Sequence, residues 1–388
     1  MSLSGLHLRG ERTRVLTAVA IADAVVPTTS TRPIQTYLQL SAQDARTEVQ
    51  ATDAQIGLRV LVPGLEILHP GTVVLPSRRL AVILRESASE SADFSVEVHE
   101  GGGTLQLRLS DGEYTLPVVL NETLPPFSFF PSNLPALALP GARLEQMLRQ
   151  TAFAMDEDRN NLVLSGLLLQ VSAGELCLAA TDGKVLAEAV EKHPSYAVRE
   201  GEVQQAILPM ATVQHLQRIL SSYETERVEL AWNTQTRLFF ARLTLRDGIS
   251  VELSSRLIEG SYPAYRMAIS GPSGGAVTFA TAALASAVRR ASLMMTTAHR
   301  PIVINLERGK AVIENLPGAA DAGIARIPLP CEYDGKPLRI GVNARYLSEV
   351  LRVFGQERIA IEFGRGLIMR EPNATFLVMP ITLPNNPA

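Results

Sequence analysis

The sequence predicts an α+β protein made of three similar domains, each with two helices packed on antiparallel sheets. Its length, 388 residues, is more than one hydrophobic core usually serves. Helix-period and strand-period segments alternate along the whole chain. A short motif also recurs with the same order of elements around it, which indicates an internal repeat.

The composition is that of a globular protein, with 46% hydrophobic and 19% charged residues. The first residues, MSLSGLHLRGERTR, lack the apolar core of a secretory signal. The longest apolar run, Val15–Val26, carries Asp23 and is too short to cross a bilayer. Cys177 and Cys331 lie far apart in apolar surroundings, as core residues do in a reducing compartment. We therefore expect a cytoplasmic protein without disulfides.

The repeated motif reads ATDAQIGLRV from Ala51 and ATDGKVLAEA from Ala180. Around each copy come a helix, two strands, the Ala-Thr-Asp turn, another strand, a second helix opening with Leu-Pro, and further strands. Pro-rich and Gly-rich stretches at 125–135 and 270–276 are typical of linkers. The predicted domains are 1–134, 135–268 and 269–388.

The expected helices have apolar residues at helical spacing, such as Leu144, Met147 and Leu148. In chain order they cover 12–26 and 75–86, then 139–155 and 208–220, then 281–295 and 343–354. Alternating apolar patterns with Gly or Asp turns predict about eight strands per domain. Examples are 101–119, 227–232 with 237–245, and 358–363 with 366–371.

Positive charge is concentrated on the predicted helices: each holds more arginine than acidic residues, although the chain has a net charge of −3. Such arginines often lie on solvated helix faces. If the helices shared one face, however, it would suit a phosphate backbone bound without sequence preference. Only 5% of residues are aromatic, which disfavours base stacking and favours duplex DNA. The candidate DNA-facing residues are Arg78, Arg79, Arg143, Arg149, Arg218, Arg289 and Arg352.

Motifs for catalysis are missing from the sequence. It has no G-x-x-x-x-G-K-[ST], H-E-x-x-H or C-x-x-C pattern, and its six histidines lack ligand spacing. A G-x-S-x-G match, GPSGG at 271–275, lies in the Gly-rich linker stretch and not in a strand–turn–helix context. The acidic stretch 155–161 lacks the turn glycine of a calcium loop. We expect no catalytic residue, metal or cofactor. A competing hypothesis, an enzyme built on the dispersed carboxylates Asp156, Glu157 and Asp182, has no nucleophile–base pattern to support it.

Three segments resemble the bacterial DNA polymerase III β subunit family, the sliding clamps. They are ATDGKVLAEA at 180–189, SSRLIEGSYPAYRMAI at 254–269 and FLVMPITL at 376–383. The family reads A-T-D-G-H-R-L-A, Leu-(Ile/Val)-x-Gly-x-(Phe/Tyr)-Pro-x-Tyr and V-M-P-(Met/Ile)-x-L there. The resemblance covers the chain and is weakest before Ala51. It implies a head-to-tail homodimeric ring of six domains around duplex DNA, a processivity factor that tethers a polymerase.

The resemblance also implies a hydrophobic groove for short peptides from the DNA polymerase III alpha subunit, the clamp loader, and other DNA polymerases and repair proteins with clamp-binding motifs. The matching positions are Leu164, Thr181, Gly183, Leu186, Pro263, Asn343, Tyr346, Leu377, Val378, Met379 and Pro380. Ring closure would join Tyr114 and Leu116 of one subunit to Leu293 and Met294 of the other. Arg78 matches a DNA-contacting arginine, and Arg79 lies beside it.

Several positions depart from the family pattern and make the groove more apolar and the middle domain less basic. They are Lys184-Val185, Met267, Leu162-Val163 and Met210-Ala211, and the chain runs on through Pro384 to Ala388. They leave open which peptides are preferred. They also leave open an alternative function, a specialised clamp-like paralogue that serves as an interaction platform without stable DNA encirclement.

Overall fold

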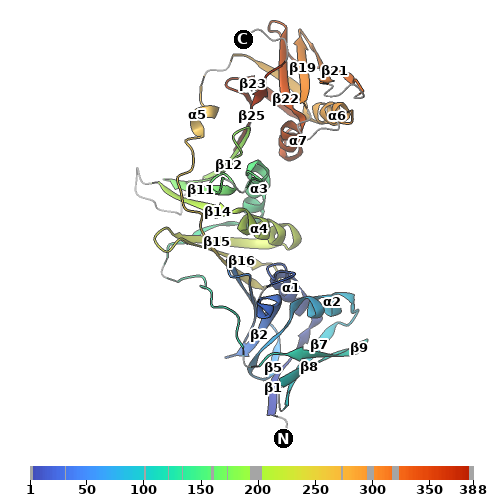
Figure 1. Ribbon diagram of the computed structural model, residues 1–388, viewed down its shortest axis with the longest axis vertical. Coiled ribbons are helices and arrows are strands. Elements are labelled where there is room, and N and C mark those ends of the chain that lie inside the picture. The colour runs from blue at the N-terminus through green and yellow to red at the C-terminus, as the bar shows by residue number, and fades with distance from the viewer. Residues whose placement is uncertain are drawn as a thin grey trace. The chain divides into compact units, whose positions relative to one another are not determined.

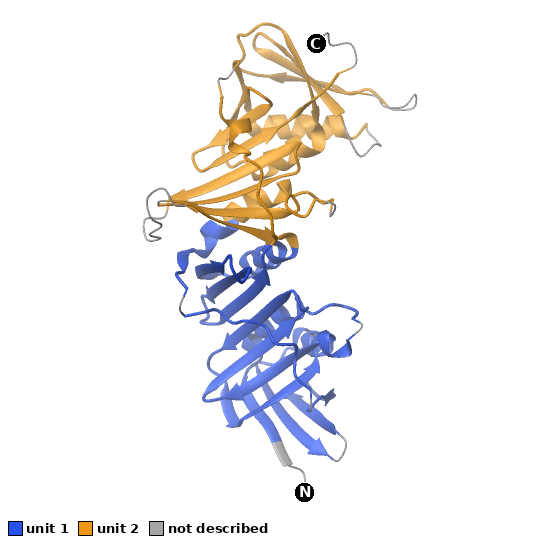
Figure 2. Ribbon diagram, turned by 60° about the vertical axis from the view of Figure 1, so that its left-hand side comes forward, with its two compact units in different colours: residues 1–145, 211–257 blue, residues 146–210, 258–388 orange. Residues whose placement is uncertain are grey.

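The computed structural model describes residues 3–30, 32–99, 102–120, 122–132, 134–158, 161–172, 174–192, 203–271, 274–294, 301–316 and 323–383. Its chain divides into two compact units (Figure 2), one of residues 1–145 and 211–257, the other of residues 146–210 and 258–388. We describe each unit by itself. The terminal stretch Pro384 to Ala388 lies outside the described residues.

The first unit holds two antiparallel sheets (Figure 1). The smaller has the order β5 (Glu66–His69), β1 (Leu3–Glu11), β7 (Ser91–His99), β8 (Gly102–Leu109), β9 (Gly112–Val118). The larger has the order β10 (Leu137–Pro140), β15 (Thr225–Asn233), β16 (Leu238–Leu245), β17 (Ser250–Arg256), β4 (Ile56–Val62), β3 (Arg46–Thr52), β2 (Tyr37–Gln43), β6 (Gly71–Pro76). Helix α1 (Arg12–Asp23) packs on β3, β4 and α2 (Ser77–Glu86), and a 3-10 turn covers Pro33–Thr36.

The second unit repeats this plan. Its larger sheet has the order β14 (Gln204–Pro209), β11 (Gly166–Ser172), β12 (Glu175–Thr181), β13 (Val185–Lys192), β25 (Ala374–Val378), β24 (Leu367–Glu371), β23 (Arg358–Phe363), β18 (Ala276–Ala280). Its smaller sheet has the order β21 (Arg326–Pro330), β20 (Lys310–Asn315), β19 (Pro301–Glu307), β22 (Leu338–Asn343), β26 (Pro380–Ile381). Helices α5 (Arg266–Ile269), α6 (Thr281–Ser292) and α7 (Ala344–Val353) belong to this unit, while α3 (Gly141–Thr151) and α4 (Met210–Ser222) cross the unit boundary.

Each eight-stranded sheet joins strands from two sequence repeats. In the first unit β4 pairs with β17, with Gly57 opposite Ser254. In the second unit β13 pairs with β25, with Leu186 opposite Leu377. The predicted α+β class with antiparallel sheets is therefore confirmed. The boundary between the two units cuts through the second predicted domain because its strands pair with both neighbours, so the boundaries at 134 and 268 stay a prediction.

All six predicted helices are present, but several are shorter than the apolar spacing suggested. The predicted helix 139–155 ends at Thr151 and continues as a 3-10 turn over Ala152–Ala154. The predicted helix 281–295 ends at Ser292 within the described residues. Both terminal hydroxyls donate to a carbonyl four residues back, Thr151 to Met147 and Ser292 to Val288, at 2.8 Å each. Such back-bonding competes with the helix and favours its end.

The Leu-Pro pairs end strands rather than open helices. Pro76, Pro140 and Pro209 are the last residues of β6, β10 and β14, and each helix begins one residue later. Proline lacks the amide hydrogen that a strand would use next, so it terminates the ladder and leads into the helix. Within the described residues, no helix is both long and apolar enough to cross a membrane.

Candidate functional site

A tight turn between β12 and β13 organises the candidate site. The Thr181 hydroxyl donates to the Val185 carbonyl at 2.7 Å and accepts the Gly183 amide at 3.0 Å. One carboxylate oxygen of Asp182 accepts the amides of Lys184 and Val185, both at 2.8 Å. Gly183 has φ +84°, a conformation that glycine adopts without strain. The Thr-Asp-Gly-Lys sequence therefore encodes a strand turn and not a phosphate loop.

The same turn occurs between β3 and β4 in the first unit. The Thr52 hydroxyl donates to the Ile56 carbonyl at 2.8 Å and accepts the Ala54 amide at 3.0 Å. Asp53 accepts the amides of Gln55 and Ile56 at 2.8 and 2.6 Å. The repeat seen in the sequence is thus a repeat of hydrogen bonds, made by short polar side chains with their own backbone.

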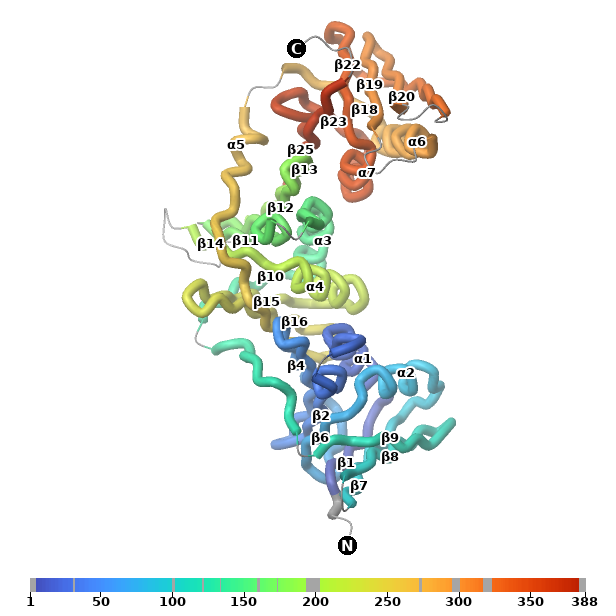
Figure 3. Tube along the Cα trace, in the orientation of Figure 1, coloured from blue at the N-terminus to red at the C-terminus, as the bar shows by residue number. Residues whose placement is uncertain are grey.

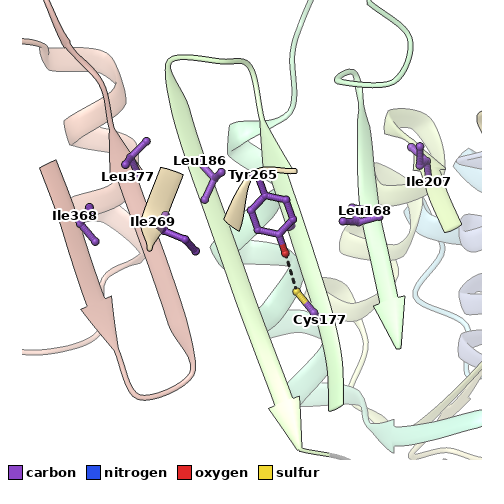
Figure 4. Packing of buried hydrophobic residues seen from close by; sticks show 9 residues of the cluster. Leu168, Cys177, Leu186, Ile207, Tyr265, Ile269, Ile368 and Leu377 are labelled. Carbon is purple, nitrogen blue, oxygen red and sulfur yellow. Dashed lines mark hydrogen bonds between the residues drawn. The ribbon is translucent and has the colours of Figure 1, made fainter. Parts of the chain in front are cut away.

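Leu186 follows the β12–β13 turn and lies opposite Leu377 of β25, where the sequence predicts the groove. Both side chains are 3% exposed. They belong to one buried cluster with Ile368, Tyr265 and Ile269 (Figure 4). Tyr265 and Ile269 come from the segment that connects β17 to β18, so this connection lies over the same face of the sheet. The sequence-predicted residues Leu186 and Leu377 are brought together as expected.

Several residues predicted for the groove are exposed, and some of these are apolar. The Met379 amide donates to the Lys184 carbonyl at 2.8 Å, which holds the methionine beside the turn, and its side chain is 37% exposed. Gly183, Pro263 and Pro380 are also exposed. A flexible thioether on a rim adapts to partner side chains of different shape. Of the remaining predicted groove residues, Thr181 and Val378 are buried, and Leu164, Asn343 and Tyr346 are half-buried.

Tyr346 of α7 is tied to the turn through Asp182. Burial raises the pKa of the tyrosine hydroxyl, and its hydrogen bond to the Asp182 carboxylate raises it further. Asn343 caps α7 by accepting the Arg345 amide at 2.9 Å. Tyr346 and Lys184 both line a surface cavity of about 540 Å³, which also contains Asp156. The turn, the α7 start and this cavity form one continuous surface of the second unit.

A buried polar cluster beneath the groove was missed by the sequence reasoning. Glu188 accepts the Tyr265 hydroxyl at 2.7 Å and the Arg266 guanidinium Nε at 2.8 Å. The Cys177 thiol lies 3.4 Å from the same carboxylate oxygen and 3.3 Å from the tyrosine oxygen. Burial, followed by the nearby carboxylate charge, raises the pKa of Cys177 to about 12. Strand alternation places Glu188 on the face of Leu186, and that signal could have predicted its position.

A second contact missed from the sequence joins the connecting segment to the turn. The Thr181 amide donates to the Tyr262 hydroxyl at 3.0 Å. Burial raises the pKa of Tyr262 to about 12, so this hydroxyl stays neutral. Together with the Glu188 contacts it fixes the segment that carries Pro263.

Three predicted DNA-facing arginines lie together in the first unit. Arg78 and Arg79 of α2 and Arg218 of α4 line one surface cavity of about 1290 Å³. No carboxylate of the described residues pairs with these three side chains. The nearby Asp23 accepts the Ser77 hydroxyl at 2.6 Å. The cavity lining also includes Arg85, so four arginines face one carboxylate, Asp23, and the surface is positive on balance.

The other four predicted arginines lie elsewhere on the helices. Arg149, Arg289 and Arg352 are exposed and Arg143 is half-buried. Arg352 is paired with Glu349 at 2.5 Å, one turn away on α7. An exposed pair of this kind is weak and can exchange for another anion.

The predicted subunit-contact residues differ in exposure. Tyr114 lies on the edge strand β9 and is 36% exposed, whereas Leu116 is 5% exposed and belongs to the chain's own core. Leu293 and Met294 follow α6 and are 72% and 43% exposed. A free strand edge and an exposed apolar pair are features of an assembly surface.

The dispersed carboxylates serve local structure. Asp182 holds the turn, Glu157 pairs with Arg345 at 2.6 Å, and Asp156 accepts the Asp158 amide at 2.9 Å. No group of three or more metal-ligating side chains occurs in the part of the chain that the structure describes. The competing enzyme hypothesis gains no support from this arrangement.

Comparison with known proteins gives a consistent result along the chain. Three family models match, described as the DNA polymerase III beta subunit N-terminal domain at residues 6–127, central domain at 138–264 and C-terminal domain at 273–381. The beta sliding clamp of Caulobacter vibrioides is 27% identical over 390 residues, 97% of this chain and 100% of the relative. That of Pseudomonas putida is 25% identical over 387 residues, with the same coverage.

Solved structures agree with this fold. A crystal structure of the C. crescentus beta sliding clamp superposes with a TM-score of 0.85 at 26% identity, covering 97% of this chain and 99% of that chain. A Pseudomonas aeruginosa sliding clamp bound to griselimycin has a TM-score of 0.85 at 23% identity, covering 98% of this chain and 100% of that one.

Proposed function

The chain belongs to the DNA polymerase III beta subunit family, the sliding clamps, and we propose that two copies close into a ring around duplex DNA and tether partner proteins to it. The ring holds DNA by topology, and each phosphate contact is weak and independent of sequence. Tethering raises the local concentration of a polymerase at its template.

The observation that carries this proposal is the shared position of Arg78, Arg79 and Arg218. They come from helices of two different sequence repeats, yet they line one surface cavity. Such convergence is what a common DNA-facing helix surface requires. The other helix arginines named above extend this surface in the proposal.

Partner tethering uses the groove of the second unit. Buried Leu186 and Leu377 supply an apolar floor, and exposed Met379 supplies an adaptable rim. This suits a short linear peptide with leucine or phenylalanine anchors. We assign to it the DNA polymerase III alpha subunit, the clamp loader, and other polymerases and repair proteins that carry clamp-binding motifs.

Ring closure joins the edge strand β9 of one subunit to the region after α6 of the other. Tyr114, Leu293 and Met294 present exposed apolar surface for this contact, and Leu116 supports it from within. The chain then acts as a non-catalytic subunit of the replication machinery in the cytoplasm.

Analytical ultracentrifugation tests the ring. At micromolar concentration the chain is expected to sediment as a dimer, and Leu293→Lys with Met294→Lys is expected to give a folded monomer. The control Val82→Lys changes an exposed apolar residue of α2 and leaves the dimer intact. A stable wild-type monomer would contradict the ring and favour an interaction platform that does not encircle DNA.

A further inference from the structure

The first unit contains a structural equivalent of the groove, and a segment of the chain itself covers it. The β3–β4 turn matches the β12–β13 turn bond for bond. The strand pairing after each turn is also equivalent: Gly57 lies opposite Ser254 in the first unit, and Leu186 lies opposite Leu377 in the second. Gly57 therefore holds the place of the groove leucine. In Figure 3 the connection between β9 and β10 passes β4 on the side away from α1.

Phe127 of this connection occupies the space above Gly57. A Cβ built at Gly57 would lie 2.1 Å from the phenylalanine Cδ2, which no real pair of atoms allows. Only a residue without a side chain permits this contact. The absence of a side chain at Gly57 thus makes room for the ring of Phe127, which lies far away in the sequence.

Two further rings of the same segment stack on arginines. The Arg59 guanidinium lies 3.9 Å from the ring centroid of Phe129, and that of Arg242 lies 4.2 Å from the centroid of Phe130. At such distances the positive charge is attracted to the face of the ring. Phe127 and Phe129 are two residues apart, as are Gly57 and Arg59, so an extended segment follows the strand.

A buried carboxylate preorganises this surface. Glu252 is 5% exposed and accepts Arg59 at 2.5 Å and Arg242 at 3.1 Å. These bonds hold both guanidinium groups in place beneath the phenyl rings. Guanidinium groups that are already fixed attract an aromatic ring without first having to be ordered.

We propose that this face of β4, β17 and β16 is a second peptide-binding site, specific for extended segments rich in phenylalanine, and that residues 125–131 occupy it in cis. A cavity of about 420 Å³ remains beside Phe127, between the β3–β4 turn and Arg256. Displacement of the segment exposes a site for an aromatic-rich peptide in trans.

The proposed site of the first unit and the proposed partner groove of the second unit are covered differently by the connecting segment that passes over each. In the second unit Glu188 stands where Arg59 stands in the first, and it anchors its segment through Tyr265 and Arg266. The rim at Met379 stays exposed there. The inference concerns a surface separate from the proposed partner groove, and it holds or fails independently of ring formation.

A first experiment displaces the segment. Gly57→Ala forces Phe127 away, and chymotrypsin, which cuts after aromatic residues, is expected to cleave within 125–131 at least tenfold faster. The matched control is Gly102→Ala, where an added Cβ meets nothing within 4 Å. Equal cleavage rates in Gly57→Ala and Gly102→Ala would overturn the cis-occupied site.

A second experiment measures binding in trans. The probe is a fluorescein-labelled peptide of sequence LPPFSFFPS, residues 124–132, and Met379→Glu silences the other groove. Adding Phe127→Ala with Phe129→Ala is expected to produce saturable binding at least tenfold tighter than in Met379→Glu alone. Adding Arg59→Gln is expected to weaken it again. Binding that is unchanged by either step, in proteins with unchanged melting curves, would refute the site.

Discussion

Replacing Thr181 by valine isolates the contribution of the β12–β13 turn to the groove. Valine keeps the shape of threonine but loses the hydrogen bonds to Val185 and Gly183. The Val185 carbonyl keeps one partner, the Asp182 amide at 3.3 Å, so it is not left unsatisfied. Two ordinary hydrogen bonds contribute about 1–2 kcal/mol to the free energy of unfolding.

The chain supplies a matched control in the equivalent turn of the first unit. Thr52→Val removes the same two bonds at almost the same distances. Both variants should lose about 1–2 kcal/mol in urea unfolding. Only Thr181→Val should weaken a leucine- or phenylalanine-anchored clamp-motif peptide, by up to about 5- to 30-fold, since 1.4 kcal/mol corresponds to a factor of ten.

The assay is fluorescence anisotropy with the labelled peptide, beside urea unfolding of each variant. Equal loss of affinity in Thr52→Val and Thr181→Val would show that general destabilisation, not the turn, controls the groove. Unchanged stability in both would refute the structural role of the hydroxyl.

Three further predictions concern the rim, the buried cluster and the arginines. Met379→Glu should lower peptide affinity at least 100-fold in the anisotropy assay and leave the sedimenting dimer intact; retained affinity would place the groove elsewhere. Because burial raises the pKa of Cys177 to about 12, above the unfolded value near 9, stability should be full below pH 9 and fall as pH rises toward 12. Between pH 8 and pH 10.5 the free energy of unfolding in urea should fall less in Cys177→Ala than in the wild type. An equal fall in the two proteins would contradict this role of Cys177. Arg218→Ala should weaken duplex DNA binding alike for all sequences and reduce its salt slope by about 1 for each phosphate that the variant no longer neutralises; an unchanged slope would show that Arg218 does not bind phosphate.

Local side-chain chemistry made the turn predictable, whereas the groove residues were predicted from the family resemblance. The bonds of Thr181 and Asp182 reach only two to four residues along the chain, so the short motif determines them. Leu186 follows that turn directly, and Leu377 and Met379 belong to one recognisable terminal motif. Helix positions were predictable because apolar spacing depends on one helix alone.

Contacts between distant segments could not be read in the same way. Glu188 bonds Tyr265 across 77 positions, and nothing local to either residue indicates the other. Phe127 over Gly57 depends on the path of a connection whose Pro-rich sequence indicates only a linker. The pairing of β4 with β17 likewise follows from tertiary packing and not from strand propensity.

The family resemblance predicts Leu116 as a subunit-contact residue, and its exposure in the structure bears on that prediction. Its strand neighbour Tyr114 is exposed on β9, but Leu116 points into the core. Alternation along β9 puts both on one face, so sequence pattern alone does not distinguish the exposed residue from the buried one. Tyr114 is accordingly the better single target for testing subunit contact.

Retention on circular DNA tests the central claim most directly. The labelled chain, loaded by the clamp loader onto a closed circular plasmid, is separated from free protein by gel filtration before and after one cut by a restriction enzyme. A sliding ring stays with the circle and dissociates once the DNA is linear. Equal dissociation from circular and linear DNA, or equal retention on both, would contradict topological encirclement.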